Sequence, residues 1–382
     1  MKSRLIRFLV NEWFFVISLT AFLISIAITQ KPPSFDWGDF RVIFILFVFL
    51  LIVKGLEESN FLSYIALKLE EGKFVTFKLT LASFVLAALI TNDVALLTVV
   101  PLSLHLRKVN IAKLVVLETL AANAGSMLTP IGNPQNIFIY HHYSISLTEF
   151  VKVTIPYSIL FLILILLLLP KDSEKPPTLK EKIAVDRKLS IVFLAFFLLF
   201  VPSALRFLPI WVGIFPILYA LFFKRKLLIK VDYFLLLTFL FFFGFTSEIS
   251  KILSPQINGS LQVFLYSVGL SQILSNVPAA LLMADFTRNW QALLLGVNVG
   301  GFGTLIASLA NLISYKIYTS RFDNRWELLK LFHLTGFLFL FLGLLVFLLS
   351  HSEFARLSAA VAKSVIDGFL FLLNTLRVLL NT

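Results

Sequence analysis

Two polar segments in otherwise apolar sequence carry side chains suited to binding a small solute. The first runs from Asn123 to Asn136 and the second from Asn298 to Asn311. When both are read in one register, without a gap, like residues fall opposite one another. The pairs are Asn123 with Asn298, Gly125 with Gly300, Thr129 with Thr304, Asn133 with Ser308, and Asn136 with Asn311. The chain therefore contains a duplicated polar unit.

A shorter polar break precedes each of these segments. Thr91, Asn92 and Asp93 interrupt the first apolar run, and Ser275 and Asn276 interrupt the second. Backbone groups freed by a break inside hydrocarbon need protein partners or a polar cavity. Paired interruptions in corresponding halves indicate a transporter binding site near the middle of the bilayer.

These breaks could bind both an anion and a small cation. Half-helices that begin beyond Asn92, Asn136 and Asn276 would offer unpaired N–H groups and positive dipole ends to an anion. The carbonyls before them, and neutral Asn, Ser and Thr oxygens, suit Na⁺ without a fixed charge at depth. We expect the cargo to bind at Thr91, Asn92, Asp93, Asn133, Asn136, Ser275, Asn276, Ser308 and Asn311. We expect the coupling ion at Asn92, Asp93, Asn123, Gly132, Asn276, Asn298 and Thr304.

Two acids and two histidines need separate interpretations. Asp93 is expected to bind the coupling cation or to carry a proton, since acids inside membrane spans are usually functional; the alternative is that it caps the helix of residues 94–106. For Glu118, pairing with Lys113 or with interfacial water is an equal alternative to function. His141 and His142 are expected to be a solvated pair at a membrane end, because no third metal ligand is evident.

Proline and glycine keep the breaks open. Pro134 and Pro278 remove backbone donors and so prevent each helix from continuing through its break. A glycine cluster in the second segment permits a positive φ or a close backbone approach; its members are Gly300, Gly301 and Gly303. For the pair Gly296 and Gly300, the alternative is simple helix packing through small residues.

Composition excludes a soluble globule. Of 382 residues, 59% are hydrophobic and 14% are charged, and the mean hydropathy is +0.93. These values are typical of a polytopic membrane protein. At ~20 residues per span, we expect about nine or ten spans. The net charge of +12 lies in short loops, so the positive-inside rule explains it better than nucleic acid does. Without cysteine, neither a disulfide nor a thiolate metal site is possible.

The charge pattern predicts two membrane halves. The first comprises residues 1–170, a cytoplasmic linker 171–188 follows, the second half is 189–350, and 351–382 form an amphipathic helix. The alternative for residues 351–382 is a further full span. Expected spans are 8–29, 40–56, 147–169, 189–206, 211–223, 231–247 and 331–350, with an interfacial helix at 55–72. Residues 74–106 and 261–284 are expected to be re-entrant hairpins entering from opposite faces, and 111–143 and 289–318 to be broken helices.

The motifs resemble the ion transporter superfamily, which groups arsenite efflux permeases, citrate-type carriers, sodium/proton antiporters of the NhaD type and divalent-anion/sodium symporters. The resemblance rests on Ile90-Thr-Asn-Asp-Val-Ala95, Pro130-Ile-Gly-Asn-Pro-Gln-Asn136 and Ser275-Asn-Val-Pro-Ala279. It implies an all-α polytopic membrane protein of two inverted repeats, each with a re-entrant hairpin and a broken transmembrane helix. It also implies a homodimer in which a transport domain moves against a scaffold.

The hairpin tips separate the subfamilies. In the divalent-anion symporters both tips read Ser-Asn-Thr and hold sodium and carboxylate; Asn92 and Ser275-Asn276 match them, whereas Asp93 and Val277 replace the Thr, which argues against a dicarboxylate. Antiporters of the NhaD type tend to carry an Asp in the second tip, which is absent here. The Thr-Asn-Asp tip is nearer to the arsenite permeases, whose cargo needs no thiol.

We therefore predict a secondary active transporter of the cell inner (plasma) membrane. It would move a small anion or oxyanion across the lipid bilayer by alternating access, driven by Na⁺ or H⁺, with no other cofactor and no nucleic-acid partner. Arsenite or antimonite efflux is the alternative. An enzyme using Asp93, Glu118 and the histidines would have no use for the duplicated register, and a channel is distinguished by flux that does not saturate.

Overall fold

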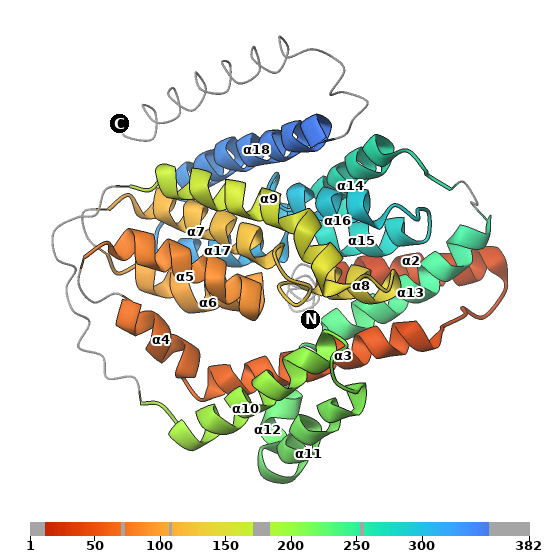
Figure 1. The fold of residues 1–382 in the computed structure, drawn as a ribbon, viewed down its shortest axis with the longest axis horizontal. Helices are drawn as coiled ribbons and strands as arrows, with labels where there is room; N and C mark the ends of the chain where they lie inside the picture. Colours follow the sequence, from red (N-terminus) through yellow and green to blue (C-terminus); the bar gives the residue numbers. More distant parts are fainter. Residues whose placement is uncertain (1–11, 70–72, 107–108, 171–183, 253–255, 351–382) are drawn as a thin grey trace, which may run out of the picture.

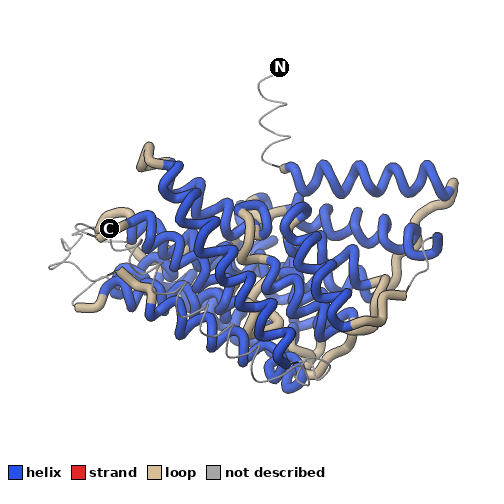
Figure 2. The backbone as a smooth tube through the Cα atoms, turned by 90° about the horizontal axis from the view of Figure 1, so that it is seen from above, coloured by secondary structure: helices blue, strands red, loops and turns tan. Residues whose placement is uncertain are grey.

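The computed structural model describes residues 12–69, 73–106, 109–170, 184–252 and 256–350, and these residues form helices joined by short connections (Figures 1 and 2). No strand occurs in these ranges. Helices satisfy their own backbone hydrogen bonds, as a hydrocarbon environment requires. The prediction of an all-α protein is confirmed.

Among the described residues, three helices are long and apolar enough to cross a bilayer by themselves: α9 (Leu147–Leu167), α10 (Arg187–Ala204) and α18 (Arg325–Ser350). Six shorter apolar helices accompany them in the described part of the chain. Their number and composition make the chain a polytopic membrane protein. The predicted inverted repeats and the re-entrant course of the hairpins remain predictions.

The first half contains α2 (Trp13–Thr29), α3 (Trp37–Glu58), α4 (Phe61–Leu69), α5 (Val75–Leu89), α6 (Asn92–Ser103), α7 (Ile111–Ser126), α8 (Pro134–His142) and α9. Capping residues fix several starts: Asp36 and Asp39 form a capping box on α3, and Ser146 and Glu149 form one on α9. Such caps satisfy backbone N–H groups that a helix cannot pair internally.

The second half contains α10, η1 (Ile210–Gly213), α11 (Ile214–Phe223), α12 (Arg225–Ile229), α13 (Tyr233–Ile252), α14 (Ser260–Leu274), α15 (Asn276–Ala284), α16 (Trp290–Gly300), η2 (Leu305–Ala307), α17 (Leu309–Thr319) and α18. Asp186 caps α10 through Leu189 N–H, so the last predicted linker residues are helical. Residues 171–183 of that linker and the predicted amphipathic helix at 351–382 lie outside the described residues.

Both predicted breaks of each half are present. Helices α5 and α6 form a hairpin joined at Ile90 and Thr91, and α14 and α15 form one joined at Ser275. The segments between α7 and α8, and between α16 and α17, break the longer helices. The predicted short spans thus occur as helical pairs.

Glycines allow each hairpin to pack closely against its neighbouring broken helix. A Cβ atom on Gly125 in α7 would lie 2.0 Å from the Phe84 carbonyl oxygen of α5, and one on Gly300 in α16 would lie 2.6 Å from Ser271 Cβ of α14. None of the second segment's glycines has a positive φ. Close packing, which was the alternative interpretation for Gly296 and Gly300, is therefore what the structure supports.

The second helix of each hairpin packs against the broken helix of the other half. Helix α6 contacts α17, and α15 contacts α8, whereas α5 and α14 lie along α7 and α16 of their own halves. In Figure 1, α9 and α18 run along the upper edge of this assembly. These contacts between the two halves bring the helix breaks of both halves into one central region of the molecule.

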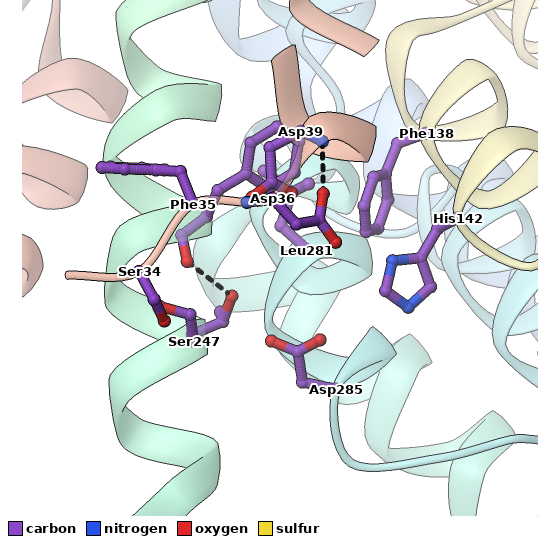
Figure 3. Close-up of a pocket in the computed structure, with 11 residues that line it drawn as sticks. Ser34, Phe35, Asp36, Asp39, Phe138, His142, Ser247, Leu281 and Asp285 are labelled. Atoms are coloured by element: carbon purple, nitrogen blue, oxygen red, sulfur yellow. Dashed lines mark hydrogen bonds between the residues drawn. The ribbon is translucent and has the colours of Figure 1, made fainter. Parts of the chain in front are cut away.

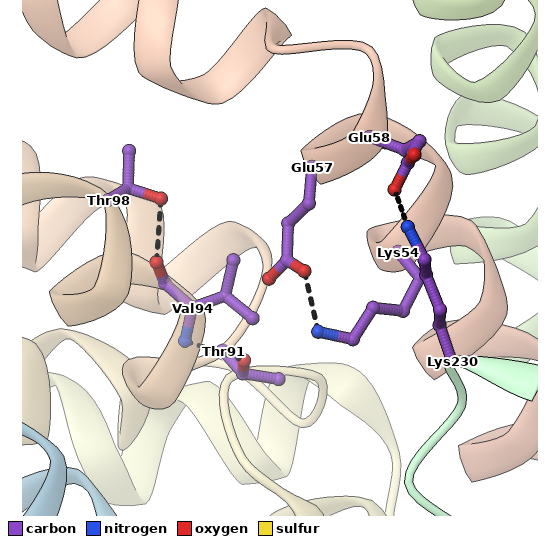
Figure 4. Close-up of polar contacts among 7 residues, drawn as sticks. All are labelled: Lys54, Glu57, Glu58, Thr91, Val94, Thr98 and Lys230. Carbon is purple, nitrogen blue, oxygen red and sulfur yellow. Dashed lines mark hydrogen bonds and ion pairs between the residues drawn. The ribbon is translucent and has the colours of Figure 1, made fainter. Parts of the chain in front are cut away.

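A second group of helices lies along the lower edge of Figure 1 and comprises α3, α10, α11 and α12. Helix α3 includes residues 55–58, so the predicted interfacial helix at 55–72 was placed too early; the structure gives α4 instead. The reason is packing, because Gly55 of α3 lies against the Phe193 ring of α10. At this end Lys54 pairs with Glu57 at 2.6 Å, and Lys230 pairs with Glu58 (Figure 4).

Candidate functional site

Four buried asparagines connect the two broken helices. Asn123 Nδ2 donates to Asn311 Oδ1 at 2.8 Å, and Asn298 Nδ2 donates to Asn136 Oδ1 at 2.8 Å. Each bond joins the first part of one broken helix to the second part of the other. All four side chains are at most 4% exposed, so the pairs are shielded from solvent.

The same asparagines also stabilise the irregular backbone of the breaks. Asn136 Nδ2 donates to the carbonyls of Ser126 and Thr129, both at 3.1 Å, and Asn311 Nδ2 donates to those of Gly301 and Thr304, at 2.9 and 3.1 Å. Residues that the sequence register pairs thus make corresponding hydrogen bonds. These bonds supply the partners that broken backbone needs inside a membrane.

Asn133 and Ser308, which are also paired by the register, extend this correspondence. Asn133 Nδ2 donates to Asn298 Oδ1 at 3.2 Å, and Ser308 Oγ donates to Asn123 Oδ1 at 3.4 Å. Each reaches across to the first asparagine of the other half. The predicted residues therefore form one network, here called the asparagine network: Asn123, Asn133, Asn136, Asn298, Ser308 and Asn311.

The hairpin tips attach to this network. Asn92 Nδ2 donates to Asn123 Oδ1 at 3.1 Å, and its backbone N–H donates to the Gly132 carbonyl at 3.2 Å. Ser275 Oγ donates to the Ala307 carbonyl at 3.3 Å. Thr304 Oγ1 donates to the carbonyl of Gln272 in α14 at 3.1 Å. Each hairpin is thereby tied to the broken helix of its own half.

Asp93 does not cap a helix. Helix α6 begins one residue earlier, at Asn92, and its cap is Thr91, whose Oγ1 accepts from Val94 N–H at 3.4 Å (Figure 4). The alternative capping role is therefore wrong. Instead, the Asp93 carboxylate lies in the first turn of α6, half-buried, and no described residue donates a hydrogen bond to it.

A small cavity of about 30 Å³ lies where the two hairpins and the two broken helices meet. Five predicted residues line it, namely Asn92, Asp93, Ser275, Asn276 and Ser308, and so do Pro134, Gln135, Leu235, Thr238, Val277, Pro278 and Leu309. The other predicted residues, Thr91, Asn123, Gly132, Asn133, Asn136, Asn298, Thr304 and Asn311, do not line it. They surround it as structural support, and their predicted binding roles remain untested.

Four helices begin at this cavity. Helices α6, α8, α15 and α17 start at Asn92, Pro134, Asn276 and Leu309, and each of these residues lines it. The start of α8 precedes Asn136, so that asparagine lies inside the helix and not before it. The fourth start, that of α17, was not singled out from the sequence.

Comparison with known proteins agrees with this architecture. The family model CitMHS, described as a citrate transporter, matches residues 6–292. The chain belongs to the citrate transporter family. The uncharacterized transporter MJ0456 of Methanocaldococcus jannaschii is 36% identical over 79% of this chain and 87% of its own length. The inner membrane protein YbiR of Escherichia coli is 31% identical over 79% and 85%.

A more distant similarity covers part of the chain: the P protein of Mus musculus is 28% identical over 131 residues, which is 31% of this chain and 16% of that protein. The membership in the ion transporter superfamily inferred from the motifs is confirmed. This member of the citrate transporter family is a membrane transporter, and the family points away from an enzyme.

Sequence reasoning missed two polar side chains of the cavity in this citrate-family transporter. Gln135 lies within the motif of residues 130–136 but has no polar counterpart in the second segment, where Ala310 takes its place. Thr238 lies in the middle of α13, where the apolar sequence gives no signal. The contact of α13 with α15 brings Thr238 to the site.

The tip of the second hairpin has unusual backbone geometry. Ser275 has φ 75° and ψ 159°, a region that is populated almost only by glycine and costs about 1–3 kcal/mol. Its counterpart Thr91 has an ordinary extended backbone, with φ −165°. The strained residue lines the cavity, as strained residues at ligand sites commonly do.

Glu118 is fully buried in α7, and Ser103 Oγ of α6 donates to its Oε1. The interpretation that interfacial water solvates this acid is therefore wrong. Its Oε2 atom has no hydrogen-bond partner in the described part of the chain. Glu118 does not line the small cavity, so it belongs to the packing of α6 against α7.

A larger cavity of about 300 Å³ lies away from the hairpin tips and is lined by Asp36, Asp39, Asp285 and His142, among others (Figure 3). His142 is exposed, whereas a ring nitrogen of His141 lies 2.9 Å from the Ala204 carbonyl oxygen. The predicted solvated pair is therefore only half right. Three carboxylates make this larger cavity a poor anion site, so the smaller one is the candidate site.

Proposed function

We propose that this transporter is a secondary active carrier of a small anion or oxyanion, driven by Na⁺ or H⁺ through alternating access. The observation that carries the proposal is the convergence of four helix starts on one small cavity. Helix N-termini carry positive partial charge, and they bind anions in many proteins. At the start of α6 the N–H groups of Asn92, Asp93 and Val94 already donate within the protein, so that helix would attract an anion through its dipole and not through free donors. Discontinuous helices use their ends in the same way in membrane carriers.

The charge balance at the cavity favours an anion. Each helix N-terminus is equivalent to roughly +0.5 elementary charge, so four of them supply about +2. Among the described residues, Asp93 is the one charged side chain in the lining, and its carboxylate supplies −1 when ionised. The sum stays positive, and it becomes more positive when Asp93 binds H⁺ or a cation.

Asp93 is the residue at which we propose coupling. Other oxygens predicted to hold the ion, such as Asn123 Oδ1 and the Gly132 carbonyl, already accept hydrogen bonds within the protein. The Asp93 carboxylate has no such partner among the described residues. A proton or Na⁺ on Asp93 would remove its repulsion of an incoming anion, so cation binding and cargo binding would favour one another.

The movement we propose is displacement of the two hairpins and the broken helices against the group of α3, α10, α11 and α12. The interlocked contacts of α6 with α17 and α15 with α8 would let the centre move as one body. We further propose that the protein resides in the cell inner (plasma) membrane and works as a homodimer. Each of these points follows from the predicted fold and the family.

Transport by the purified full chain in liposomes tests the proposal. We would measure uptake of labelled citrate, and of phosphate and arsenite, with a Na⁺ or pH gradient imposed. Asn92→Ala and Asn276→Ala should abolish uptake, since both residues line the cavity. Asn258→Ala, at an exposed position before α14 whose side chain makes no hydrogen bond with the described residues, is the matched control. Full uptake by either cavity variant would refute the site.

Arsenite or antimonite efflux is the second candidate, and the size of the cavity favours it. A volume of about 30 Å³ holds one or two water-sized groups, so a compact hydroxide requires less widening of the cavity than citrate does. Amide and hydroxyl groups could hydrogen-bond such a cargo. Protection of a sensitive host by expression of the wild type, but not of Asn276→Ala, would favour this candidate.

A further inference from the structure

Gln135 is the least expected polar group of the cavity. It is the second residue of α8, its side chain is 1% exposed, and it lines the cavity together with Asp93. Its Nε2 atom has no hydrogen-bond partner in the described part of the chain. A buried amide donor without an acceptor is costly, so a native site that keeps one calls for an explanation.

The fold itself does not need this amide. Its sequence neighbours Asn133 and Asn136 are fully engaged in the asparagine network. At the corresponding position of the second segment stands Ala310, which is fully buried. The same backbone arrangement therefore forms with a methyl group there, and the extra amide of Gln135 is available for something that the fold does not supply.

Gln135 and Asp93 share this asymmetry. The register places Ala310 at the position equivalent to Gln135, and matching the hairpin tips at Asn92 and Asn276 places Val277 at the position equivalent to Asp93. Both polar residues therefore have apolar counterparts in the second half. Both nevertheless line the same cavity. One contributes an acceptor for a cation, and the other contributes N–H donors, which an oxygen of the cargo can accept.

We propose that Gln135 Nε2 donates a hydrogen bond to an oxygen of the transported anion and is thus a specificity-determining residue. This inference rests on the proposed anion carrier. The cargo class is an anion or oxyacid with oxygen acceptors, a carboxylate or an inorganic oxyanion. A site built to hydrogen-bond a group of its ligand rejects ligands that lack the group, because the donor is then left unpaired.

The test uses the purified full chain and two variants. Gln135→Met keeps the length of the side chain but removes its donors, and Gln135→Ala copies the residue found at position 310. Gln262→Met, at an exposed position of α14, is the matched control. Apparent Kd values for citrate, phosphate and arsenite are taken from ligand-dependent shifts of thermal unfolding, which report binding to the folded state by mass action.

For the probe that stabilises the wild type most, we expect both Gln135 variants to bind at least tenfold more weakly, and the control to be unchanged. Without ligand, Gln135→Met should unfold at the wild-type temperature or above it, because an unpaired buried donor has been removed while the length of the side chain is kept. If both variants bind that probe as tightly as the wild type does, the inference about Gln135 is overturned, and the proposed anion carrier is unaffected. Unfolding of Gln135→Met at a clearly lower temperature without ligand also overturns it, since the amide would then be structural. Absence of binding by the wild type with all three probes refutes the anion carrier, and this inference falls with it.

Discussion

Replacing Asn298 by alanine should destabilise the protein by breaking the bond between the two halves. Asn298 Nδ2 donates to Asn136 Oδ1 and to the Leu294 carbonyl, both at 2.8 Å, and Asn298 Oδ1 accepts from Asn133 at 3.2 Å. Alanine leaves Asn136 Oδ1 buried without its donor. Asn133 keeps its second acceptor, Ser126 Oγ at 3.2 Å.

One orphaned buried acceptor therefore determines the size of the effect. Leaving such a group unpaired costs about 1–3 kcal/mol, and measured hydrogen bonds between membrane helices average about 0.6 kcal/mol. We expect a loss of about 1–3 kcal/mol, because the orphaned atom sits in a packed interior and not beside a mobile helix. At roughly 2 °C per kcal/mol for a chain of this size, Tm should fall by about 2–6 °C.

Tryptophan fluorescence during heating measures this change, since the chain has five tryptophans and no cysteine for a thiol dye. Trp290 opens α16, the helix that carries Asn298, and reports on it locally. Asn258→Ala, at an exposed position before α14, is the surface control. If Asn298→Ala lowers Tm no more than this control does, the asparagine network does not stabilise the fold and the reasoning is wrong.

A double-mutant cycle isolates the bond itself. Asn136→Ala combined with Asn298→Ala should cost less than the sum of the single changes, because the second substitution removes the group that the first left unpaired. The corresponding cycle of Asn123 with Asn311, whose bond is also 2.8 Å long, should give a coupling energy of similar size. Coupling in one cycle but not in the other would contradict the equivalence of the two halves.

Three further predictions concern packing, strain and coupling. Gly300→Ala should destabilise the protein by about 1–3 kcal/mol, because the added Cβ would lie 2.6 Å from Ser271 Cβ. The control Gly269→Ala adds a Cβ that meets nothing within 4 Å, so it should leave thermal stability unchanged or raise it. Ser275→Gly should leave Tm unchanged or raise it. The substitution relieves about 1–3 kcal/mol of backbone strain, which exceeds the loss of one hydrogen bond of about 1 kcal/mol. A fall in Tm would show that the conformation is not strained. Asp93→Asn should keep anion binding, measured by thermal shift, but make uptake in liposomes independent of the imposed Na⁺ or pH gradient; uptake that still follows the gradient would move coupling elsewhere.

The breaks could be located from sequence because hydrocarbon surroundings leave few alternatives. A polar residue in an apolar run of this length either ends a helix or lines a cavity, so the Thr91 to Asp93 and Ser275 to Asn276 interruptions identified the hairpin tips. Proline and asparagine at Pro134 and Asn136 marked the second kind of break in the same way. Most other helix ends lie within about three residues of the expected spans, but α13 ends at Ile252 and not at residue 247, and α18 begins at Arg325 and not at residue 331.

Contacts between the halves could not be found in this way. The register aligns Asn123 with Asn298 as equivalent residues, but it does not say that Asn123 bonds to Asn311 and not to Asn298. That choice follows from the packing of α6 on α17 and of α15 on α8, which depends on the path of the whole chain. For the same reason Thr238 of α13 and the start of α17 at Leu309 could not be assigned to the cavity beforehand.

The departures from symmetry are as informative as the symmetry. A carrier whose two halves were identical would offer the same groups to the cargo from both sides, and nothing in such a site would distinguish the driving ion from the cargo. Here the asparagine network repeats in both halves, whereas Asp93 and Gln135 have the apolar counterparts Val277 and Ala310. The repeated residues bond to one another, and the unrepeated ones face the cavity without protein partners among the described residues. We infer that the repeated residues form the structural support of the site, and that the residues without a repeated counterpart bind the ion and the cargo. Relatives with another cargo should therefore differ first at positions 93 and 135, while keeping the asparagines that bond across the halves.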